Sequence, residues 1–172
     1  MRAFIGLGAN LGDPRATFAA AVRDLAGIGQ AVRVSSLYET APRDRVDQPR
    51  FLNAALELSV ELEPTELLFH LKRIESSHGR EPAFRFGPRV LDLDILSFDG
   101  FCVTDTDLDL IVPHPRLQER RFALEPLAEL EPGLRPWRGC ADFRTDVTVA
   151  DLLPSVADQE VVRVAGPEWA DR

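Results

Sequence analysis

The 172-residue sequence predicts an α+β fold, a ferredoxin-like βαββαβ sandwich in which helices pack on one face of a mainly antiparallel sheet. Apolar residues recur at every second position in some segments and at every third and fourth position in others, so strands and helices can be distinguished. The resulting order is strand, helix, strand, strand, helix, strand. Two consecutive strands disfavour a doubly wound α/β fold. With 45% hydrophobic residues, the chain can bury one core and is short for two.

The first strand is expected over residues 3–8, a short apolar run. Asp13 and Pro14 then supply an N-cap and a proline at the first helical position, so a helix is expected over 14–27. Apolar residues recur along it at helical spacing. A second strand is expected over 31–38, followed by a polar loop.

The third strand has the clearest pattern in the sequence. Over residues 51–62, leucine, alanine and valine alternate with polar residues. Pro64 opens the second helix, and Gly79 is its expected C-terminal stop. The fourth strand is expected over 91–98, and the Asp-Gly pair at 99–100 is typical of a hairpin turn.

The rest of the chain has weaker patterns. Short extended pieces are expected over 101–112, and a helix over 122–130. From about residue 131 the sequence is rich in proline and glycine, with one short helix expected near 148–153 and a last strand at 160–164. We therefore predict a single domain over the whole chain, with a C-terminal extension.

Composition and charge disfavour several functional classes. The net charge of −8 argues against a general nucleic-acid binder, which is usually basic. No apolar run approaches the roughly 20 residues of a membrane helix, and the N-terminus lacks the pattern of a signal peptide. Cys102 and Cys140 belong to no metal-binding or CxxC pattern, so reduced thiols in a cytoplasmic protein are expected. We expect a monomer with small-molecule partners.

Asp92 and Asp94 are the most informative polar residues. On a strand, positions i and i+2 point the same way, so both carboxylates share a face. Hard oxygen ligands of this kind suit Mg²⁺, whereas the alternative is a solvated face of an edge strand. Arg80, Arg85 and Arg89 precede the pair in an irregular, glycine-containing loop. Carboxylates and arginines together indicate phosphoryl chemistry more than either does alone.

Two other motifs are weaker signals. The glycines of residues 6–12 follow GxGxxxG rather than the dinucleotide-binding GxGxxG spacing, so a tight turn with close backbone packing is the better interpretation. The aspartates of residues 105–109 resemble a calcium loop, but the glycine and glutamate required further along are missing. Taken alone, Phe51, Asn53, His114 and Phe122 indicate no site.

Several segments, taken together, resemble one known family. The longest is 85–96, read as RFGPRVLDLDIL. The others, in the same order as in the family, are 6–13, 35–40, 47–55, 112–117, 120–122 and 125–127. They resemble 6-hydroxymethyl-7,8-dihydropterin pyrophosphokinase, an enzyme family of folate biosynthesis.

The resemblance implies a ferredoxin-like fold and transfer of a pyrophosphoryl group from ATP. The pterin hydroxymethyl oxygen would attack the β-phosphorus, and AMP would leave. Asp92 and Asp94 would hold two Mg²⁺ ions that bridge the phosphates, which agrees with the positioning logic of phosphoryl transfer. Arg80 and Arg89 would act in catalysis through contacts with the phosphates.

The resemblance also implies two sets of substrate contacts. Those expected to bind ATP are Glu75, Arg80, Arg89, Ile95, His114 and Arg120, with Ile95 against the adenine. Those expected to bind the pterin are Thr40, Pro42, Phe51, Asn53, Asp92 and Phe122. The two phenylalanines would sandwich the ring, while Asn53 and the backbone near Thr40 and Pro42 would read its polar edge. The loops 43–50 and 80–90 would close over both substrates.

Two other hypotheses remain open. One is a non-catalytic ferredoxin-like ligand-binding domain, and the other is a metal-dependent phosphohydrolase that uses the same aspartates. The chain also departs from the family in the loop after Gly79, where Phe86 replaces a tryptophan common in the family. Asp109 and Pro115 stand where some members carry Arg and Tyr near the nucleotide.

Overall fold

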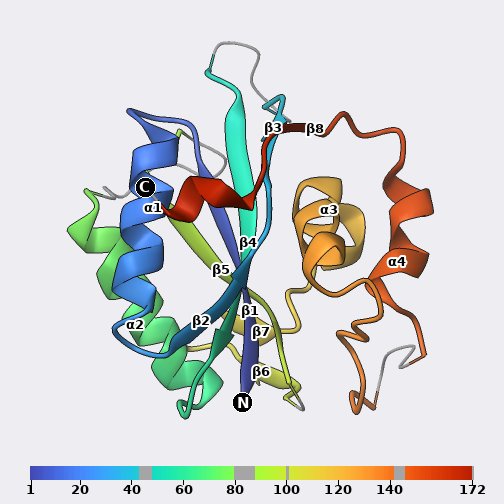
Figure 1. Cartoon of the computed structure of the whole chain (residues 1–172). Coiled ribbons are helices and arrows are strands. Elements are labelled where there is room, and N and C mark those ends of the chain that lie inside the picture. Colours follow the sequence, from blue (N-terminus) through green and yellow to red (C-terminus); the bar gives the residue numbers. More distant parts are fainter. Residues whose placement is uncertain (43–47, 80–87, 100, 142–145, 172) are drawn as a thin grey trace.

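The molecule is built around one six-stranded antiparallel sheet (Figure 1). The computed structural model describes residues 1–42, 48–79, 88–99, 101–141 and 146–171. The strands are β1 (Arg2–Ala9), β2 (Gln30–Val34), β3 (Leu37–Thr40), β4 (Phe51–Ser59), β5 (Asp92–Phe98) and β8 (Val162–Ala165). They follow the order β5-β1-β4-β3-β8, and β2 also pairs with β4. This order, with β1 between β5 and β4, confirms the ferredoxin-like fold class.

The two main helices begin where the sequence predicts. The helix α1 (Pro14–Leu25) starts after Asp13, whose side chain accepts a hydrogen bond from the Ala16 amide at 3.1 Å. The helix α2 (Pro64–Ser77) starts at its predicted proline. Gly79 lies just beyond α2 with a φ of +80°, a conformation that favours glycine, so the predicted stop is also confirmed.

Helices cover both faces of the sheet, so the prediction of a single covered face is wrong. Figure 1 shows α1 and α2 on one side, with α3 (Arg121–Leu130) and α4 (Val149–Leu152) on the other. Both faces are covered because the strands carry apolar side chains on both faces. Successive residues such as Phe4 and Ile5 point to opposite faces and belong to different cores. The core under α1 and α2 includes Ile5, Phe18, Leu56, Leu71, Leu93 and Ile95. The core under α3 includes Phe4, Ala55, Leu96, Leu124, Leu127 and Trp137.

The predicted second strand is broken at two serines. The strand β2 ends before Ser35 and β3 begins after Ser36. The Ser35 hydroxyl accepts a hydrogen bond from the Ala55 amide at 2.8 Å, and a side-chain oxygen thereby takes the place of a backbone acceptor. The amide and hydroxyl of Ser36 donate to Glu129 of α3, at 2.9 and 2.8 Å. These contacts interrupt the strand, and its hydrophobic pattern does not reveal them.

The C-terminal segment is part of the fold. The strand β8 pairs with β3, and Trp169 is fully buried beside Phe18. Its indole N–H donates to the carbonyl of Ser35 at 2.8 Å. Short 3₁₀ helices span Leu117–Glu119, Leu153–Val156 and Pro167–Asp171. Among the described residues, no helix has the length and apolar character needed to cross a membrane.

A separate hairpin follows β5. The strands β6 (Val103–Asp105) and β7 (Leu110–Val112) pair only with each other in the described structure. The hairpin expected at 99–100 is therefore wrong, because β5 and β6 lie in different sheets. Residue 100 itself lies outside the described residues.

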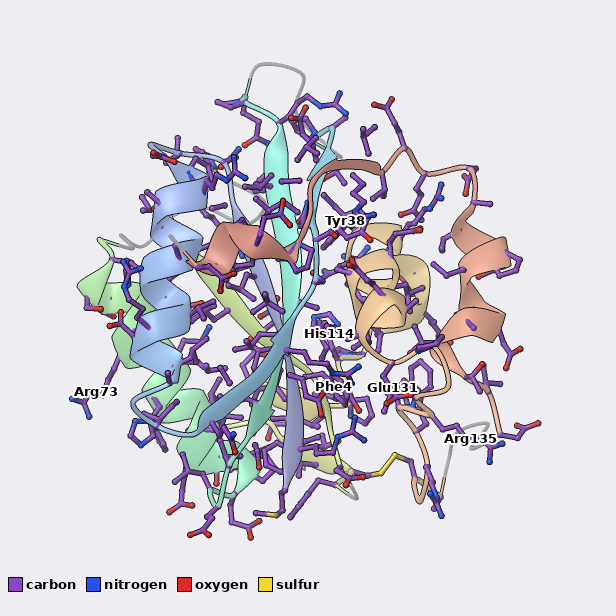
Figure 2. The ribbon with its side chains drawn as sticks, in the orientation of Figure 1. Phe4, Tyr38, Arg73, His114, Glu131 and Arg135 are labelled. Atoms are coloured by element: carbon purple, nitrogen blue, oxygen red, sulfur yellow. A yellow bond between two sulfur atoms is a disulfide. The ribbon has the colours of Figure 1, made fainter. Side chains whose placement is uncertain are left out.

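The two cysteines form a disulfide, so the expectation of reduced thiols is also wrong. Cys102 and Cys140 have Cα atoms 5.6 Å apart, within the usual range for such a bond. Figure 2 shows the bond in yellow near the lower edge of the molecule. It connects the segment after β5 with the C-terminal extension. The residues lie 38 positions apart, and their spacing carried no signal of contact.

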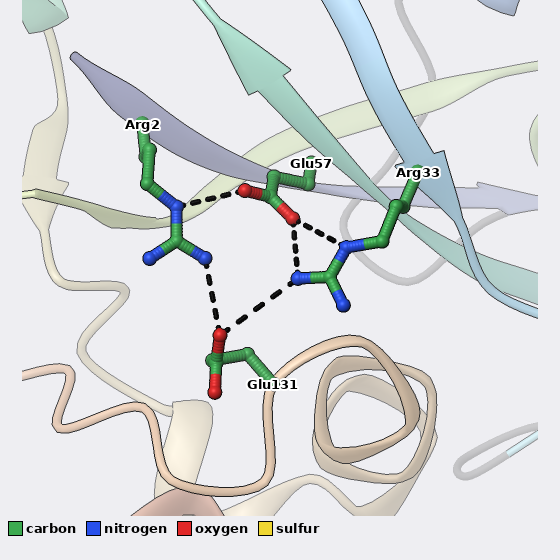
Figure 3. A network of polar contacts seen from close by, with 4 residues as sticks. All are labelled: Arg2, Arg33, Glu57 and Glu131. Carbon is green, nitrogen blue, oxygen red and sulfur yellow. Dashed lines mark hydrogen bonds and ion pairs between the residues drawn. The ribbon is translucent and has the colours of Figure 1, made fainter.

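An ion-pair network fastens the end of α3 to the sheet (Figure 3). Glu57 of β4 accepts hydrogen bonds from the guanidinium groups of Arg2 and Arg33, with shortest distances of 2.7 and 2.6 Å. Arg2 also reaches Glu131 at 3.2 Å. Burial would raise the pKa of Glu57, but the two arginines more than compensate and lower it. The network keeps the buried carboxylate of Glu57 charged.

Candidate active site

A cavity of about 270 Å³ opens on the α3 side of the sheet. It brings together most of the residues that the sequence singles out. Those predicted residues are Thr40, Phe51, Asn53, Arg89, Asp92, Asp94, His114, Arg120 and Phe122. They come from β3, β4 and β5, the start of α3 and the segments before β5 and α3. Residues that are distant in the sequence therefore share one concave site, the usual location for a small-molecule site.

Glycines of β1 form the cavity floor. Gly8 of β1 pairs with Asn53 of β4 on one side and Asp92 of β5 on the other. A Cβ atom at Gly8 would lie 3.8 Å from the Asn53 Oδ1 and 3.9 Å from the Asp92 Cβ. It would thus occupy the space between the two side chains without a clash. The missing side chain leaves room for a flat ligand.

Asp92 and Asp94 share the cavity face of β5, as predicted. Burial and the neighbouring charge of Asp92 raise the pKa of Asp94 to about 6, although Lys72 and Arg120 oppose the shift. The guanidinium group of Arg89 donates a hydrogen bond to Asp92. A cation would relieve the repulsion between these carboxylates.

The donor set suits Mg²⁺ better than metals that need many protein ligands. Among the described residues, no group of three or more His, Cys, Asp or Glu side chains could hold a metal ion. Mg²⁺ commonly takes one or two carboxylates and completes its shell with water and phosphate oxygens. Two aspartates beside an arginine fit that arrangement.

His114 and Arg120 form a pair of hydrogen-bond donors at the cavity wall. The His114 Nδ1 accepts a hydrogen bond from the Arg116 amide at 3.1 Å, so a neutral ring carries its proton on Nε2. Burial and the charges of Arg120 and Arg116 lower the pKa of His114 to about 4. The Nε2 atom lies 3.3 Å from the Arg120 Nη1. Two donors that face each other in this way favour an anionic oxygen as a shared acceptor.

Aromatic and amide groups line another part of the cavity. Phe51 opens β4, and Phe122 lies in the first turn of α3 with the Arg120 guanidinium 5.7 Å from its ring centroid. Asn53 is buried and donates to the Thr40 hydroxyl at 3.0 Å. This bond orients the amide of Asn53, so that a heterocycle between the rings would meet a fixed polar group.

Some predicted contacts do not line the cavity. Ile95 points into the core under α1 and α2. Glu75 is 1% exposed and accepts a hydrogen bond from the Leu93 amide at 2.7 Å. The cavity reaches Ala41 but not Pro42. Arg80, with Arg85 and Phe86, falls outside the described residues. The nucleotide contacts expected of Glu75, Ile95 and Arg80 stay predictions.

The structure adds Gln48, which the sequence did not single out, to the cavity lining. Arg116, which belongs to the basic segment that includes His114 and Arg120, also lines the cavity and pairs with Glu119 at 3.0 Å.

The glycine motif is closely packed as expected, since a Cβ atom at Gly6 would lie 3.1 Å from the Leu96 side chain. The expected turn at Gly6 and Gly8 is wrong, because both lie inside β1. Only Gly12, with a φ of +68°, serves a turn. The place of Gly8 in the cavity floor depends on how β1 is paired with β4 and β5, and no local sequence pattern gives that pairing.

Comparisons with known proteins agree with this geometry. The family model described as 7,8-dihydro-6-hydroxymethylpterin-pyrophosphokinase (HPPK) matches residues 4–132. A 2-amino-4-hydroxy-6-hydroxymethyldihydropteridine pyrophosphokinase of Bacillus subtilis is 42% identical, covering 94% of this chain and 89% of its own. The protein of that name from Methylorubrum extorquens is 45% identical, over 77% of this chain and 84% of its own.

Longer proteins also match. A mitochondrial folate synthesis bifunctional protein of Pisum sativum is 47% identical over 73% of this chain, which corresponds to 24% of the plant protein. A crystal structure of HPPK-DHPS from Plasmodium falciparum superposes with a TM-score of 0.69 at 14% identity, over 91% of this chain and 45% of that one. The structural match supports the fold, and the sequence matches support the family. The chain belongs to the 7,8-dihydro-6-hydroxymethylpterin-pyrophosphokinase family, whose reaction transfers pyrophosphate from ATP to hydroxymethyldihydropterin in folate biosynthesis.

Proposed function

We propose that the described cavity is the active site of a Mg²⁺-dependent pyrophosphokinase that uses ATP and 6-hydroxymethyl-7,8-dihydropterin. One observation carries the proposal: the aspartate pair of β5 and the donor pair His114 and Arg120 open into the same cavity. Carboxylates suit a cation, and the two donors suit phosphate oxygens. A polar cluster that only stabilises the fold would not need both the aspartate pair and the donor pair to face an open cavity.

Asp92 and Asp94 would hold two Mg²⁺ ions. When bound, the ions would draw electron density from the transferred phosphoryl group and orient the attacking hydroxyl. Without ligands, the guanidinium group of Arg89 binds Asp92. When nucleotide enters, this group would bind phosphate oxygens instead, and Mg²⁺ would take its place beside Asp92. The carboxylate would thus have a cationic partner both with and without nucleotide.

The nucleotide phosphates would lie against the basic wall. His114 would donate from Nε2 to a phosphate oxygen, and Arg120 and Arg89 would contribute charge. A neutral His114 keeps its single ring proton on Nε2, because Nδ1 accepts the hydrogen bond from the Arg116 amide. Contacts of Arg80, Glu75 and Ile95 with the rest of ATP remain part of this proposal.

The pterin would lie between Phe51 and Phe122 above Gly8. An offset stack suits a flat heterocycle, and the edge would meet Asn53 and the backbone near Thr40 and Pro42. This position would place the hydroxymethyl group near Asp92. Both substrates would thus meet at the carboxylate pair, where the new P–O bond forms and the bond to AMP breaks.

We further propose that the chain acts as a single-domain monomer in the cytoplasm, without nucleic-acid or membrane partners. The pairing of β8 with β3 supports the inclusion of the C-terminal segment in that domain. The Cys102–Cys140 disulfide argues against a cytoplasmic location, because cytoplasmic thiols are usually reduced.

The test is an assay with ATP, Mg²⁺ and 6-hydroxymethyl-7,8-dihydropterin. AMP is expected to appear in step with pterin consumption, and Asp92→Ala or Asp94→Ala should abolish turnover while circular dichroism remains native. Release of inorganic phosphate without pterin would indicate the phosphohydrolase instead. Nucleotide binding that ignores Mg²⁺, with no turnover, would favour the non-catalytic domain.

A further inference from the structure

Asn10 is a buried polar residue that none of the roles above uses. It follows β1 directly and is 4% exposed. Two chain segments that lie far apart in sequence meet at its side chain. Both segments carry residues that line the cavity, so the contacts of Asn10 bear on how the walls are placed.

The first segment precedes β4. The Asn10 Nδ2 donates to the Gln48 Oε1 at 3.2 Å and to the Pro49 carbonyl at 3.1 Å. Gln48 lines the cavity, and Phe51 follows three positions later. Both hydrogen bonds are donated by the NH₂ group of the Asn10 side chain.

The second segment precedes β5. The Asn10 Oδ1 accepts a hydrogen bond from the Arg89 amide at 2.8 Å. The Arg89 carbonyl in turn accepts hydrogen bonds from the backbone amides of Asn10 and Leu11, at 2.9 and 3.2 Å. Arg89 also binds Asp92 through its side chain. The carbonyl oxygen of the same amide therefore binds the segment that carries Arg89, a proposed phosphate contact.

We propose that Asn10 is a positioning residue for pyrophosphate transfer, because its single amide fixes the segment at 48–49 relative to Arg89. The inference rests on the proposed function of the cavity. A planar amide offers an acceptor and two donor hydrogens on separate atoms at a fixed separation, whereas the hydroxyl of Ser or Thr carries both functions on one oxygen. Asn10 does not line the cavity itself; it acts through Gln48, Pro49 and Arg89.

The expected effect follows from geometry. Each substrate would still find its own contacts in a variant without the amide, so affinities should change little. The relative placement of the reacting atoms would loosen, and a misplacement of about 1 Å can cost about 100-fold in rate. A residue that only stabilises the fold would instead lower the melting temperature and leave the rate of folded enzyme unchanged.

The experiment compares wild type with Asn10→Ala, and with Asn10→Leu, which keeps most of the side-chain volume. The chemical step is measured in a single turnover with Mg²⁺ and ATP at a temperature well below unfolding. Dissociation constants for a non-hydrolysable ATP analogue and for the pterin are measured by calorimetry. The control is Ser36→Ala, which removes the hydrogen bond from a buried hydroxyl to Glu129, away from the cavity.

Both Asn10 variants are expected to slow the chemical step at least 10-fold, with dissociation constants within threefold of wild type. Ser36→Ala should lower the melting temperature and keep the wild-type rate. Wild-type rates in both Asn10 variants would overturn the proposal. So would a loss of affinity that accounts for the whole loss of rate, since Asn10 would then support binding alone. A wild-type protein that produces no AMP would instead refute the proposed function.

Discussion

The carboxylate of Asp94 lies where its charge destabilises the metal-free fold, and Asp94→Asn is expected to stabilise that state. Its pKa rises from 3.8 to about 6 because of burial and the charge of Asp92. The folded protein therefore binds this proton more tightly than the unfolded chain. Above pH 6 the fold holds an unfavourable charge, whereas below about pH 4 both states are protonated and the penalty vanishes.

The magnitude follows from the shift. About two pKa units at about 1.4 kcal/mol each give about 3 kcal/mol as an upper bound. Water at the open cavity reduces this value, and Asp92 shares the titration, so about 1–3 kcal/mol is expected. Asn keeps the shape and removes the charge. The gain should be near zero at pH 4 and reach its full value by pH 7.

The assay is urea unfolding in the presence of EDTA, at several pH values between 4 and 7. The matched control is Asp158→Asn, which changes an exposed carboxylate. A variant no more stable than wild type at pH 7, or a difference that does not grow with pH, would refute the reasoning. Added Mg²⁺ should then stabilise wild type and leave Asp94→Asn unchanged, since only wild type keeps both proposed metal ligands.

Other changes separate binding, acid stability and cross-linking. Gly8→Ala should keep the wild-type melting temperature and weaken pterin binding at least 10-fold by calorimetry, because its Cβ fits but fills the floor; equal affinity would remove Gly8 from the site. His114 should make the fold less stable as the pH falls from 6.5 to about 4, since its pKa is lowered in the fold; His114→Gln should lose this part of the acid sensitivity in urea unfolding, and an unchanged pH profile would contradict the assignment. Reduction of the Cys102–Cys140 bond should cost roughly 3–4 kcal/mol of unfolding free energy and leave the rate of AMP formation unchanged at low temperature; Cys102→Ala should behave like the reduced protein, and a loss of turnover there would link the bond to the cavity.

Local patterns sufficed for much of the fold. The element order, the starts of α1 and α2 and the shared face of Asp92 and Asp94 all depend on residues close in sequence. Periodicity and capping report such short-range relations directly. The resemblance to a family then selected side chains that the structure brings to one cavity.

Long-range relations were not accessible in the same way. The break at Ser35 depends on its contact with Ala55, and the second covered face depends on where α3 packs. Gly8 becomes a floor only through its register with β4 and β5. The link made by Asn10 likewise joins residues 38 and 79 positions away. None of these distances is encoded in spacing along the chain.

The pairing of β8 with β3 has a consequence for synthesis of the protein. The strand β3 ends at Thr40, whereas its neighbour begins at Val162, so more than a hundred residues must leave the ribosome before the two can meet. During that interval the edge of β3 presents unpaired backbone groups to other chains. Pairing across such a separation is also slow. Nascent or truncated chains that lack β8 should therefore aggregate through β3, and chaperone demand should end when Trp169 docks beside Phe18.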